Sequence, residues 1–273
     1  MHYRLSYEPQ EKIALNPDFK QIGSTRKQID TKLSLIIPTF QEEKLLEEQL
    51  KRFSPEIRKK YNFELIVSDG GSTDKTVEIA KKYADKIVLH DCDKRQTIAA
   101  GRNNGASVAI GDVLVFLNAD SYPADLDKFF SEILAWANDT SDCCGAIACY
   151  VSGFPSEIRF KDKVFYFLHN QYVAFLNFIG LGMGRGECQI VRRSIFEQVG
   201  GYNNEIVAGE DFDLYRRINK VAKVKFCRNI VVLESTRRFR KYGYFKTLLY
   251  WGLNAVTVML FNKSITKEWE AVR

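Results

Sequence analysis

The sequence predicts an α/β protein with a mostly parallel, doubly wound sheet flanked by helices. Leu33–Ile37 is a nearly continuous apolar run that ends at Pro38, and Glu64–Val67 repeats this pattern of a strand buried on both faces. After these runs, Glu42–Lys59 and Asp74–Tyr83 carry apolar residues at helical spacing. Strands that alternate with helices form βαβ units, and such units place their strands in parallel.

The alternation continues to about residue 120 and then becomes less regular. Ile87–Leu89 and Val113–Leu117 are the next predicted strands, and a helix is expected around Thr97–Ala109 between them. The second half offers a helix with apolar residues from Leu126 to Leu134, a strand at Ala146–Val151, and then aromatic-rich and glycine-rich segments. We therefore expect one domain with a regular first half and an irregular second half.

The domain boundaries follow from composition. A chain of 273 residues is long enough for one large domain or two small ones. Residues 1–31 are polar, contain Pro9 and Pro17 and show no clear period, so we expect them to form an extension. The domain proper is predicted to span residues 32–242, and a C-terminal helical extension is predicted in residues 243–273.

Two apolar stretches, Val164–Leu181 and Leu248–Phe261, require a separate explanation. No run in the chain reaches the roughly 18 apolar residues that a membrane span needs, so no spanning helix is expected. Each stretch could lie in a membrane interface as an amphipathic helix, pack on the sheet, or contact a partner subunit. Packing is the favoured interpretation, because short apolar runs are more often core helices.

The net charge of +6 comes from 40 Lys and Arg against 34 Asp and Glu. The excess is concentrated in residues 216–241, where Glu234 is the only acid. Such a basic segment attracts phosphates on a nucleotide, an anionic membrane or a nucleic acid. A solvated helix face is an equally good explanation for any one of these residues.

The cysteines and the N-terminus bear on the compartment. Six cysteines without C-x-x-C spacing, beside three histidines, form no zinc-binding pattern. The first residues, from Met1 to Lys12, carry no apolar core of a secretory signal. We therefore expect a cytoplasmic protein with free thiols.

Acidic groups follow several predicted strands. Val115–Asp120 is an apolar run that ends in a carboxylate, and ligands of open α/β sheets bind outside the carboxyl ends of strands. A hard divalent cation on phosphates is usually held by one or two protein carboxylates. In Ser68–Asp74, Asp69 could bind a base or ribose, and Ala208–Asp213 offers adjacent acids suited to a general base. Ordinary turns and helix N-termini also favour acids, which is the alternative for each site.

Five motifs, in their order and spacing, resemble the family 2 glycosyltransferases of the GT-A fold. They are Ile36–Glu43, Ile66–Asp74, Gly101–Gly105, Phe116–Asp120, and Gly200–Tyr202 followed by Gly209–Asp211. The resemblance covers Lys32–Tyr242, so residues 32–242 are expected to form the GT-A domain. It implies a hexosyltransferase that moves a sugar from a nucleotide-diphosphate donor to an acceptor hydroxyl with inversion.

The resemblance also implies roles for individual residues. Asp211 would be the general base, and Glu210 would orient the acceptor or substitute as base. Asp120 would bind a Mg²⁺ or Mn²⁺ that bridges the two phosphates. The donor-binding residues would be Pro38, Thr39, Glu42, Asp69, Arg102, Asn118, Ala119, Asp120, Arg237 and Arg238.

The chain departs from the family pattern at two positions. Asn118 replaces the first acid of the usual Asp-x-Asp, and an amide is a weaker ligand for a hard cation than a carboxylate. Gln41 stands where Asn is common, which should change the turn more than the chemistry. The glycine-rich residues 180–187 lack the spacing of a dinucleotide loop. They are either an acceptor-side loop or a plain linker, and in the first case Glu187, Cys188 and Gln189 would face the acceptor.

The leading hypothesis is a cytoplasmic inverting glycosyltransferase with a UDP-sugar as the expected donor. Its acceptor would be a glycan, a lipid-linked molecule or a small molecule. Contact with the inner face of a membrane is a further expectation that rests on the two apolar stretches and on the basic late segment. Homodimerisation is another, and it rests on the apolar stretches. The alternative is a catalytically silent nucleotide-sugar sensor or scaffold. Nucleic acid is not expected as a partner, because no recognition motif accompanies the basic segment.

Overall fold

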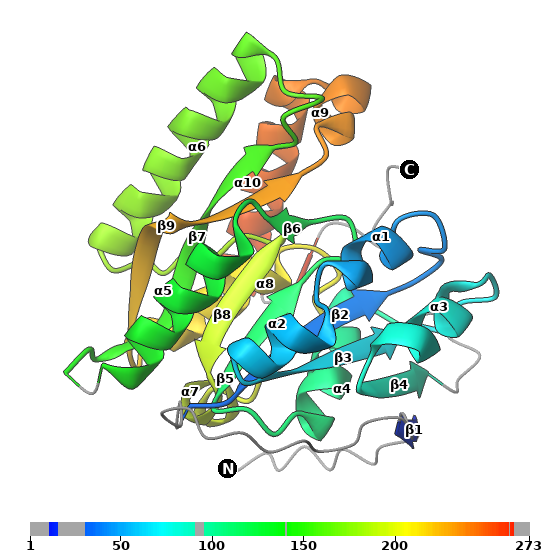
Figure 1. Cartoon of the computed structure of the whole chain (residues 1–273). Coiled ribbons are helices and arrows are strands. Elements are labelled where there is room, and N and C mark those ends of the chain that lie inside the picture. Colours follow the sequence, from blue (N-terminus) through cyan, green and yellow to red (C-terminus); the bar gives the residue numbers. More distant parts are fainter. Residues whose placement is uncertain (1–10, 16–30, 91–95, 140, 262, 265–273) are drawn as a thin grey trace.

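The computed structural model of this protein describes residues 11–15, 31–90, 96–139, 141–261 and 263–264. A nine-stranded sheet runs through this part in the order β1-β4-β3-β2-β5-β8-β7-β9-β6, with helices packed on it (Figure 1). The predicted α/β fold class is therefore confirmed. The helices after the first two are α3 (Thr76–Tyr83), α4 (Ile98–Val108), α5 (Leu126–Asn138), α6 (Phe160–Phe178), α7 (Arg193–Gln198), α8 (Glu210–Ile218), α9 (Arg237–Tyr242) and α10 (Tyr244–Phe261).

The first half of the sheet is parallel, as predicted. It consists of β2 (Leu33–Thr39), β3 (Phe63–Asp69), β4 (Lys86–His90) and β5 (Val113–Leu117), with β2 paired to both β3 and β5. β3 and β5 are buried along their whole length and β2 nearly so, as expected for the apolar runs in the sequence. The polar segments that follow β2, β3 and β5 therefore meet at one edge of the sheet.

The second half of the sheet is mixed. β8 (Cys188–Arg192) lies antiparallel between β5 and β7 (Cys144–Gly153), and β9 (Lys223–Glu234) runs parallel to β7. Short β6 (Tyr122–Pro123) pairs antiparallel with β9. At the other edge β1 (Glu11–Leu15), within the predicted N-terminal extension, pairs antiparallel with β4. The antiparallel β8 brings residues 185–188 beside the carboxyl end of β5.

The single helix predicted over Glu42–Lys59 was wrong, because this segment forms two short helices. α1 (Leu46–Lys51) ends before Ser54, and α2 (Pro55–Lys60) begins after it. Pro55 at the first helical position and the Ser54 hydroxyl, which accepts from the Ile57 N–H, are both signals for a new helix start.

Two apolar cores lie on opposite faces of the sheet. Leu35 and Ile37 of β2 belong to one core, together with Phe130 of α5. Ile36, between them in sequence, belongs to the other core, which includes Leu214 of α8. Because successive strand residues point to opposite faces, a run without alternation is what a sheet covered on both sides requires.

Helices α6 and α10 each keep an apolar side exposed. α6 packs against the sheet through Tyr166, Asn170 and Val173, as predicted, but this contact covers only one side of the helix. The exposed large apolar residues of the two helices are Phe160, Val164, Phe167, Leu168, Tyr172, Phe175, Phe178, Phe245, Leu248, Leu249, Tyr250, Leu253, Val256, Met259 and Phe261. In the part of the chain that the structure covers, no helix is both long and apolar enough to span a membrane. The cysteines described there are free, as expected.

Candidate active site

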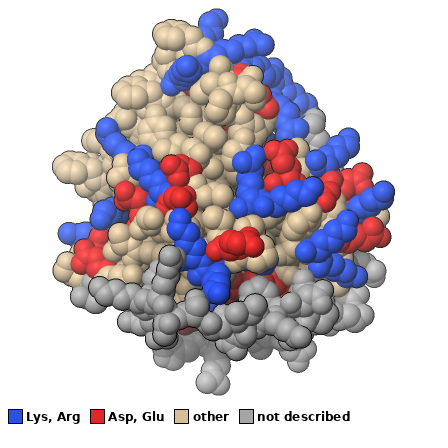
Figure 2. Space-filling view, in the orientation of Figure 1, with Lys and Arg blue, Asp and Glu red and all other residues tan. Residues whose placement is uncertain are grey.

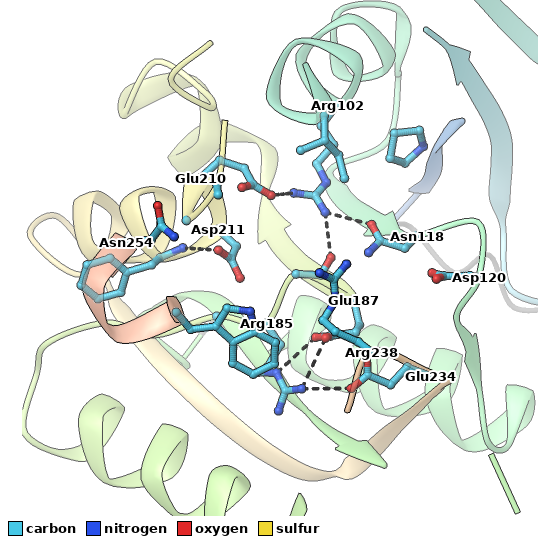
Figure 3. A pocket seen from close by; sticks show the side chains of 18 of the residues that line it. Arg102, Asn118, Asp120, Arg185, Glu187, Glu210, Asp211, Glu234, Arg238 and Asn254 are labelled. Carbon is cyan, nitrogen blue, oxygen red and sulfur yellow. Dashed lines mark hydrogen bonds and ion pairs between the residues drawn. The ribbon is translucent and has the colours of Figure 1, made fainter. Parts of the chain in front are cut away.

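A cavity of about 850 Å³ lies at the carboxyl edge of β2, β3 and β5, and Figure 3 shows the charged groups that line it. Eleven of the twelve predicted site residues line this cavity, namely Pro38, Thr39, Glu42, Arg102, Asn118, Ala119, Asp120, Glu210, Asp211, Arg237 and Arg238. Residues more than 100 positions apart in sequence thus form one site, as the parallel topology predicts.

Asp69 is the predicted residue that does not line the cavity. Its Oδ2 accepts from the Gly71 and Ser72 N–H groups at 3.0 and 2.8 Å. Its Oδ1 accepts from the hydroxyls of Ser72 and Thr39, at 2.6 and 3.1 Å. The carboxylate is buried and fixes the turn after β3, which places the lining residue Gly70 against Thr39.

Arg102 is the centre of a buried network under the cavity floor. Its side chain is 1% exposed. Nη1 donates to Glu210 Oε1 at 2.8 Å, and Nη2 donates to Asn118 Oδ1 at 2.9 Å and to the Gly186 carbonyl at 2.7 Å (Figure 3). The guanidinium therefore ties together α4, the end of β5, α8 and the segment before β8.

Glycine makes this arrangement of α4 possible. A Cβ at Gly105 would clash with the Ile36 side chain of β2, so only glycine lets α4 lie this close to the sheet. Arg102, one turn earlier on the same helix, then reaches across the ends of β2 and β5. The Gly101–Gly105 motif thus positions an arginine inside the protein.

Asp120 is the predicted metal ligand, and it lines the cavity. It follows β5 in a turn closed by the Ser121 N–H, which donates to the Asn118 carbonyl at 3.1 Å. Its side chain is exposed to the cavity, yet the enclosing walls and the negative charge of Glu187 raise its pKa, while Arg237 and Arg238 oppose this rise. The described residues contain no group of three or more His, Cys, Asp and Glu side chains arranged around a metal position.

This donor set fits a Mg²⁺ or Mn²⁺ that arrives with a diphosphate. Such ions commonly take one or two protein carboxylates and complete their coordination with phosphate oxygens and water. Asn118 is adjacent, but its Oδ1 already accepts from Arg102. Asp120 would therefore be the protein carboxylate on the ion.

Asp211 lies across the cavity from Asp120, at the first turn of α8 (Figure 3). α8 begins after Gly209, whose φ of 88° is the left-handed conformation that glycine adopts without strain. Burial, and then the negative charge of Glu210, raise the pKa of Asp211 to about 7. A carboxyl group with this pKa can accept a proton at neutral pH and hold it. Glu210 itself is buried in its ion pair with Arg102.

A second charged cluster lies in the same cavity and was not predicted as a unit. Arg185 Nε donates to Glu187 Oε2 at 3.1 Å, and its Nη2 lies 3.4 Å from Glu234 Oε1. Its Nη1 lies 3.2 Å from His169 Nδ1. Burial and the nearby Arg185 lower the pKa of His169 to about 3, so the ring is neutral.

The acids of this cluster titrate differently. Burial works to raise the pKa of Glu187, but the charge of Arg185 outweighs it and lowers the value to about 2. Burial and the charge of Glu187 raise the pKa of Glu234 well above its usual range. Glu187, Cys188 and Gln189 were considered as residues that face the acceptor. Glu187 lines the cavity, whereas Cys188 and Gln189 are buried in β8 and do not. Glu234 could have been found from the sequence, because it ends an apolar strand as Asp120 follows one.

The two predicted arginines, Arg237 and Arg238, begin α9 and line the cavity. The segment that carries them is fixed by hydrogen bonds to Glu157 and Asp162. Glu157 Oε2 accepts from the Ser235 hydroxyl at 2.8 Å and from the Thr236 N–H at 3.0 Å. Arg240 Nη1 donates to the buried Asp162 at 3.0 Å. These contacts place two positive groups on the side of the cavity where Asp120 lies.

Curated relatives match parts of the chain. A glucuronosyltransferase of Methanococcus voltae, named as acting on dolichyl N-acetyl-α-D-glucosaminyl phosphate, is 35% identical over 96 residues, which are 33% of this chain and 30% of that protein. Glycosyltransferase AglE of Haloferax volcanii is 24% identical over 213 residues, 76% of this chain and 68% of its own length. The match thus spans less than a third of the M. voltae relative.

Solved structures show the same fold. A mannosyltransferase from Pyrobaculum calidifontis, in complex with GDP-Man and Mn²⁺, superposes with a TM-score of 0.58 at 20% identity over 81% of this chain and 59% of that one. TarS 1–349 of S. aureus, in complex with UDP-GlcNAc, gives a TM-score of 0.57 at 16% identity, over 87% and 68% of the two chains. At these identities the likeness concerns the GT-A fold alone. Residues 34–200, more than half of the chain, match the sequence profile of glycosyl transferase family 2, and the chain therefore belongs to that family.

Proposed function

We propose that this protein transfers a sugar from a nucleotide-diphosphate donor to an acceptor hydroxyl, with inversion at the anomeric carbon. The observation that carries the proposal is the placement of two carboxylates, Asp120 and Asp211, across one cavity. Asp120 lies near two arginines, which suits a diphosphate, and Asp211 has the raised pKa of a general base.

The residues divide the chemistry between the two sides. Asp211 takes the proton of the acceptor hydroxyl while the oxygen of that hydroxyl forms a bond to the anomeric carbon. The bond from that carbon to the diphosphate breaks, and the nucleoside diphosphate leaves on the opposite side. Arg237 and Arg238 neutralise the negative charge that develops there. A divalent ion on Asp120, when bound, would supply further neutralisation.

Glu210 is proposed to position Arg102 and not to act as the base, since its Oε1 accepts from Arg102 at 2.8 Å. Its negative charge also raises the pKa of Asp211. One base suffices for inversion, because no covalent sugar intermediate is needed.

Donor binding is the first test. Calorimetric titration with UDP-, GDP- and dTDP-sugars, each with Mn²⁺ and with chelator, should give metal-dependent binding of one donor. We propose a UDP-sugar, which is what TarS 1–349 holds in one of its structures. Absence of binding to every donor by the folded protein would contradict the proposal.

A silent sugar-nucleotide sensor or scaffold is the second candidate, favoured by Asn118 in place of the usual acid. The two functions differ in turnover. The donor is incubated with cell extracts that contain acceptors, and release of nucleoside diphosphate is measured. Release by the wild type that is lost in Asp211→Asn, while donor binding persists, would exclude the sensor. Donor binding with no such release would favour it.

We also propose that the protein lies peripherally on the anionic inner face of a membrane. α6 contains a single acid, Asp162, which pairs with Arg240, and α10 contains none. Figure 2 shows Lys and Arg gathered at the upper end of the molecule, over the start of α6 and over α9, beside a largely uncharged surface along α6. An apolar face flanked by basic groups suits anionic lipid.

Vesicle sedimentation tests this placement. Wild-type protein should sediment with phosphatidylglycerol vesicles and much less with phosphatidylcholine, and the double variant Phe245→Ser, Leu249→Ser should remain in solution. If the wild type does not bind vesicles and the same substitutions convert a dimer to a monomer in ultracentrifugation, the exposed faces are a subunit interface instead.

A further inference from the structure

One wall of the cavity is apolar, and nothing in the proposed chemistry uses it. This wall is formed by Leu168 and Tyr172 of α6 and by Leu248, Trp251 and Ala255 of α10. On α10 these residues recur at helical spacing, so they form one stripe along the helix. The stripe is distinct from the exposed stripe of Phe245, Leu249 and Leu253, and the helix is therefore apolar on two sides.

The apolar wall is built into the fold. Trp251 packs against His169 with ring centroids 5.5 Å apart and against Phe239 at 6.1 Å, which joins α10 to α6 and α9. At its other end α10 contacts α8 beside Gly209, which precedes Asp211 by two residues. One helix thus contributes to the apolar wall and contacts the turn before the proposed base, and both line the same cavity.

The wall offers few polar groups, and the side-chain amide of Asn254, which also lines the cavity, donates to the Tyr250 carbonyl at 3.0 Å. His169 is neutral because its pKa is lowered to about 3, and Arg185 behind it is paired with Glu187 and Glu234. Leu168 and Leu248 line the cavity and are 60% and 43% exposed, so much of their aliphatic surface is not covered by the described part of the chain. Apolar surface left exposed in this way marks a site of interaction.

We propose that this wall binds the hydrocarbon part of an amphiphilic acceptor whose hydroxyl is deprotonated by Asp211. The inference rests on the proposed function for the reacting end, and it names the chemical class of the acceptor. Because Asp211, Trp251 and Leu248 line one cavity, a molecule whose hydroxyl reaches Asp211 can extend along Trp251 and Leu248. A hydrocarbon chain that leaves the cavity there meets further apolar surface on α6 and α10, including Val164 and Leu249.

A glycan stacked on Trp251 and Tyr172 is the competing occupant, since aromatic rings also bind sugars. The aliphatic residues decide against it. Leu168, Leu248 and Ala255 cannot form side-chain hydrogen bonds, so a sugar at this wall would find few partners for its hydroxyl groups beyond Tyr172 and Asn254, whereas a hydrocarbon needs none.

The test compares hexyl, octyl and decyl β-glucosides below their micelle concentrations, titrated calorimetrically into the full chain with UDP and Mn²⁺ present. Each buried methylene should tighten binding by up to about fourfold, so octyl glucoside should bind roughly tenfold tighter than hexyl glucoside. Leu248→Ser should weaken octyl glucoside binding by about tenfold. Leu253→Ser is the matched control, because Leu253 lies on the same helix with 48% exposure but does not line the cavity.

Binding of UDP with Mn²⁺, measured on the same samples, separates the two proposals. If UDP binds and chain length has no effect, or if both serine variants weaken binding equally, the apolar acceptor site is refuted. If chain length and Leu248 matter but no nucleotide binds, the apolar site stands and the proposed function fails. Affinity for cellobiose and cellotriose that rises with length and falls in Leu248→Ser would overturn the inference in favour of a glycan.

Discussion

Replacing Asp211 with Asn should abolish sugar transfer and, above pH 7, stabilise the folded protein. The pKa of Asp211 is raised from 3.8 to about 7, first by burial and then by Glu210. A group whose pKa is higher in the folded state binds its proton more tightly there, so Asp211 contributes a loss of stability to the wild type as the pH rises from about 4 to about 7. Asn cannot ionise and escapes this loss.

The size of the effect follows from the shift. One pKa unit corresponds to about 1.4 kcal/mol, which sets an upper limit of about 4 kcal/mol for the full shift. The side chain is partly accessible to water, so we expect roughly half of this limit in practice. The variant should match the wild type below pH 4, gain stability between pH 4 and 7, and keep a constant advantage above pH 7.

Urea denaturation at pH 4, 6 and 8 measures this difference, and a glycosyl transfer assay measures the base. The wild-type rate should fall about tenfold for each pH unit below 7. Asp213→Asn is a useful control, because Asp213 is a buried acid of the same helix that pairs with Arg217 away from the cavity. An Asp211→Asn protein that still transfers sugar, or whose stability differs from wild type by the same amount at every pH, would refute the assignment.

Three further substitutions test other parts of the site. Asp120→Ala should weaken Mn²⁺-dependent UDP binding by at least about tenfold in calorimetry and leave any binding in chelator unchanged; an unaltered metal dependence would exclude Asp120 as ligand. Arg102→Ala should lower the free energy of unfolding by about 3 to 5 kcal/mol, because Glu210 would remain as a buried charge without its partner. A loss below about 1 kcal/mol would mean that the Glu210 carboxylate is hydrated in the folded protein. Arg238→Ala should weaken UDP binding by about tenfold at low salt and by less at high salt, whereas a salt-independent loss would argue for a packing role.

Much of the fold and the position of the site could be predicted because the signals are local. Apolar runs without alternation mark β2, β3 and β5, and each is followed within a few residues by its polar segment. Parallel strands then bring these segments to one edge whatever the details of the loops. The break at Pro55 was visible too, but the apolar spacing across it suggested one helix.

The partners of buried charges could not be predicted, because they come from distant segments. Arg102 and Glu210 are 108 residues apart, and nothing near Arg102 indicates that its guanidinium is held inside the protein. The sequence suggested that this arginine approaches the donor. Asp69 illustrates the same limit, since its carboxylate is taken up by the N–H groups of its own turn. Side-chain orientation at a strand end depends on such contacts.

The replacement of an acid by Asn118 follows from the same network. Arg102 already pairs with Glu210, so an amide at position 118 satisfies the second guanidinium nitrogen without another negative charge near Asp120 and Glu187. A carboxylate in Asn118→Asp would be drawn to Arg102 in the same way, and away from the metal. We therefore expect the Mn²⁺ dependence of UDP binding to change by less than about threefold.

The added charge should act on Asp211 instead, because the new carboxylate would compete with Glu210 for Arg102, whose charge opposes the rise in the Asp211 pKa. The pH–rate profile of Asn118→Asp should therefore move to higher pH. Parallel calorimetry and rate measurements on this variant compare the two effects directly. Binding that becomes more than about tenfold more dependent on Mn²⁺, with an unmoved pH profile, would mean that residue 118 turns to the metal and that Arg102 does not fix it.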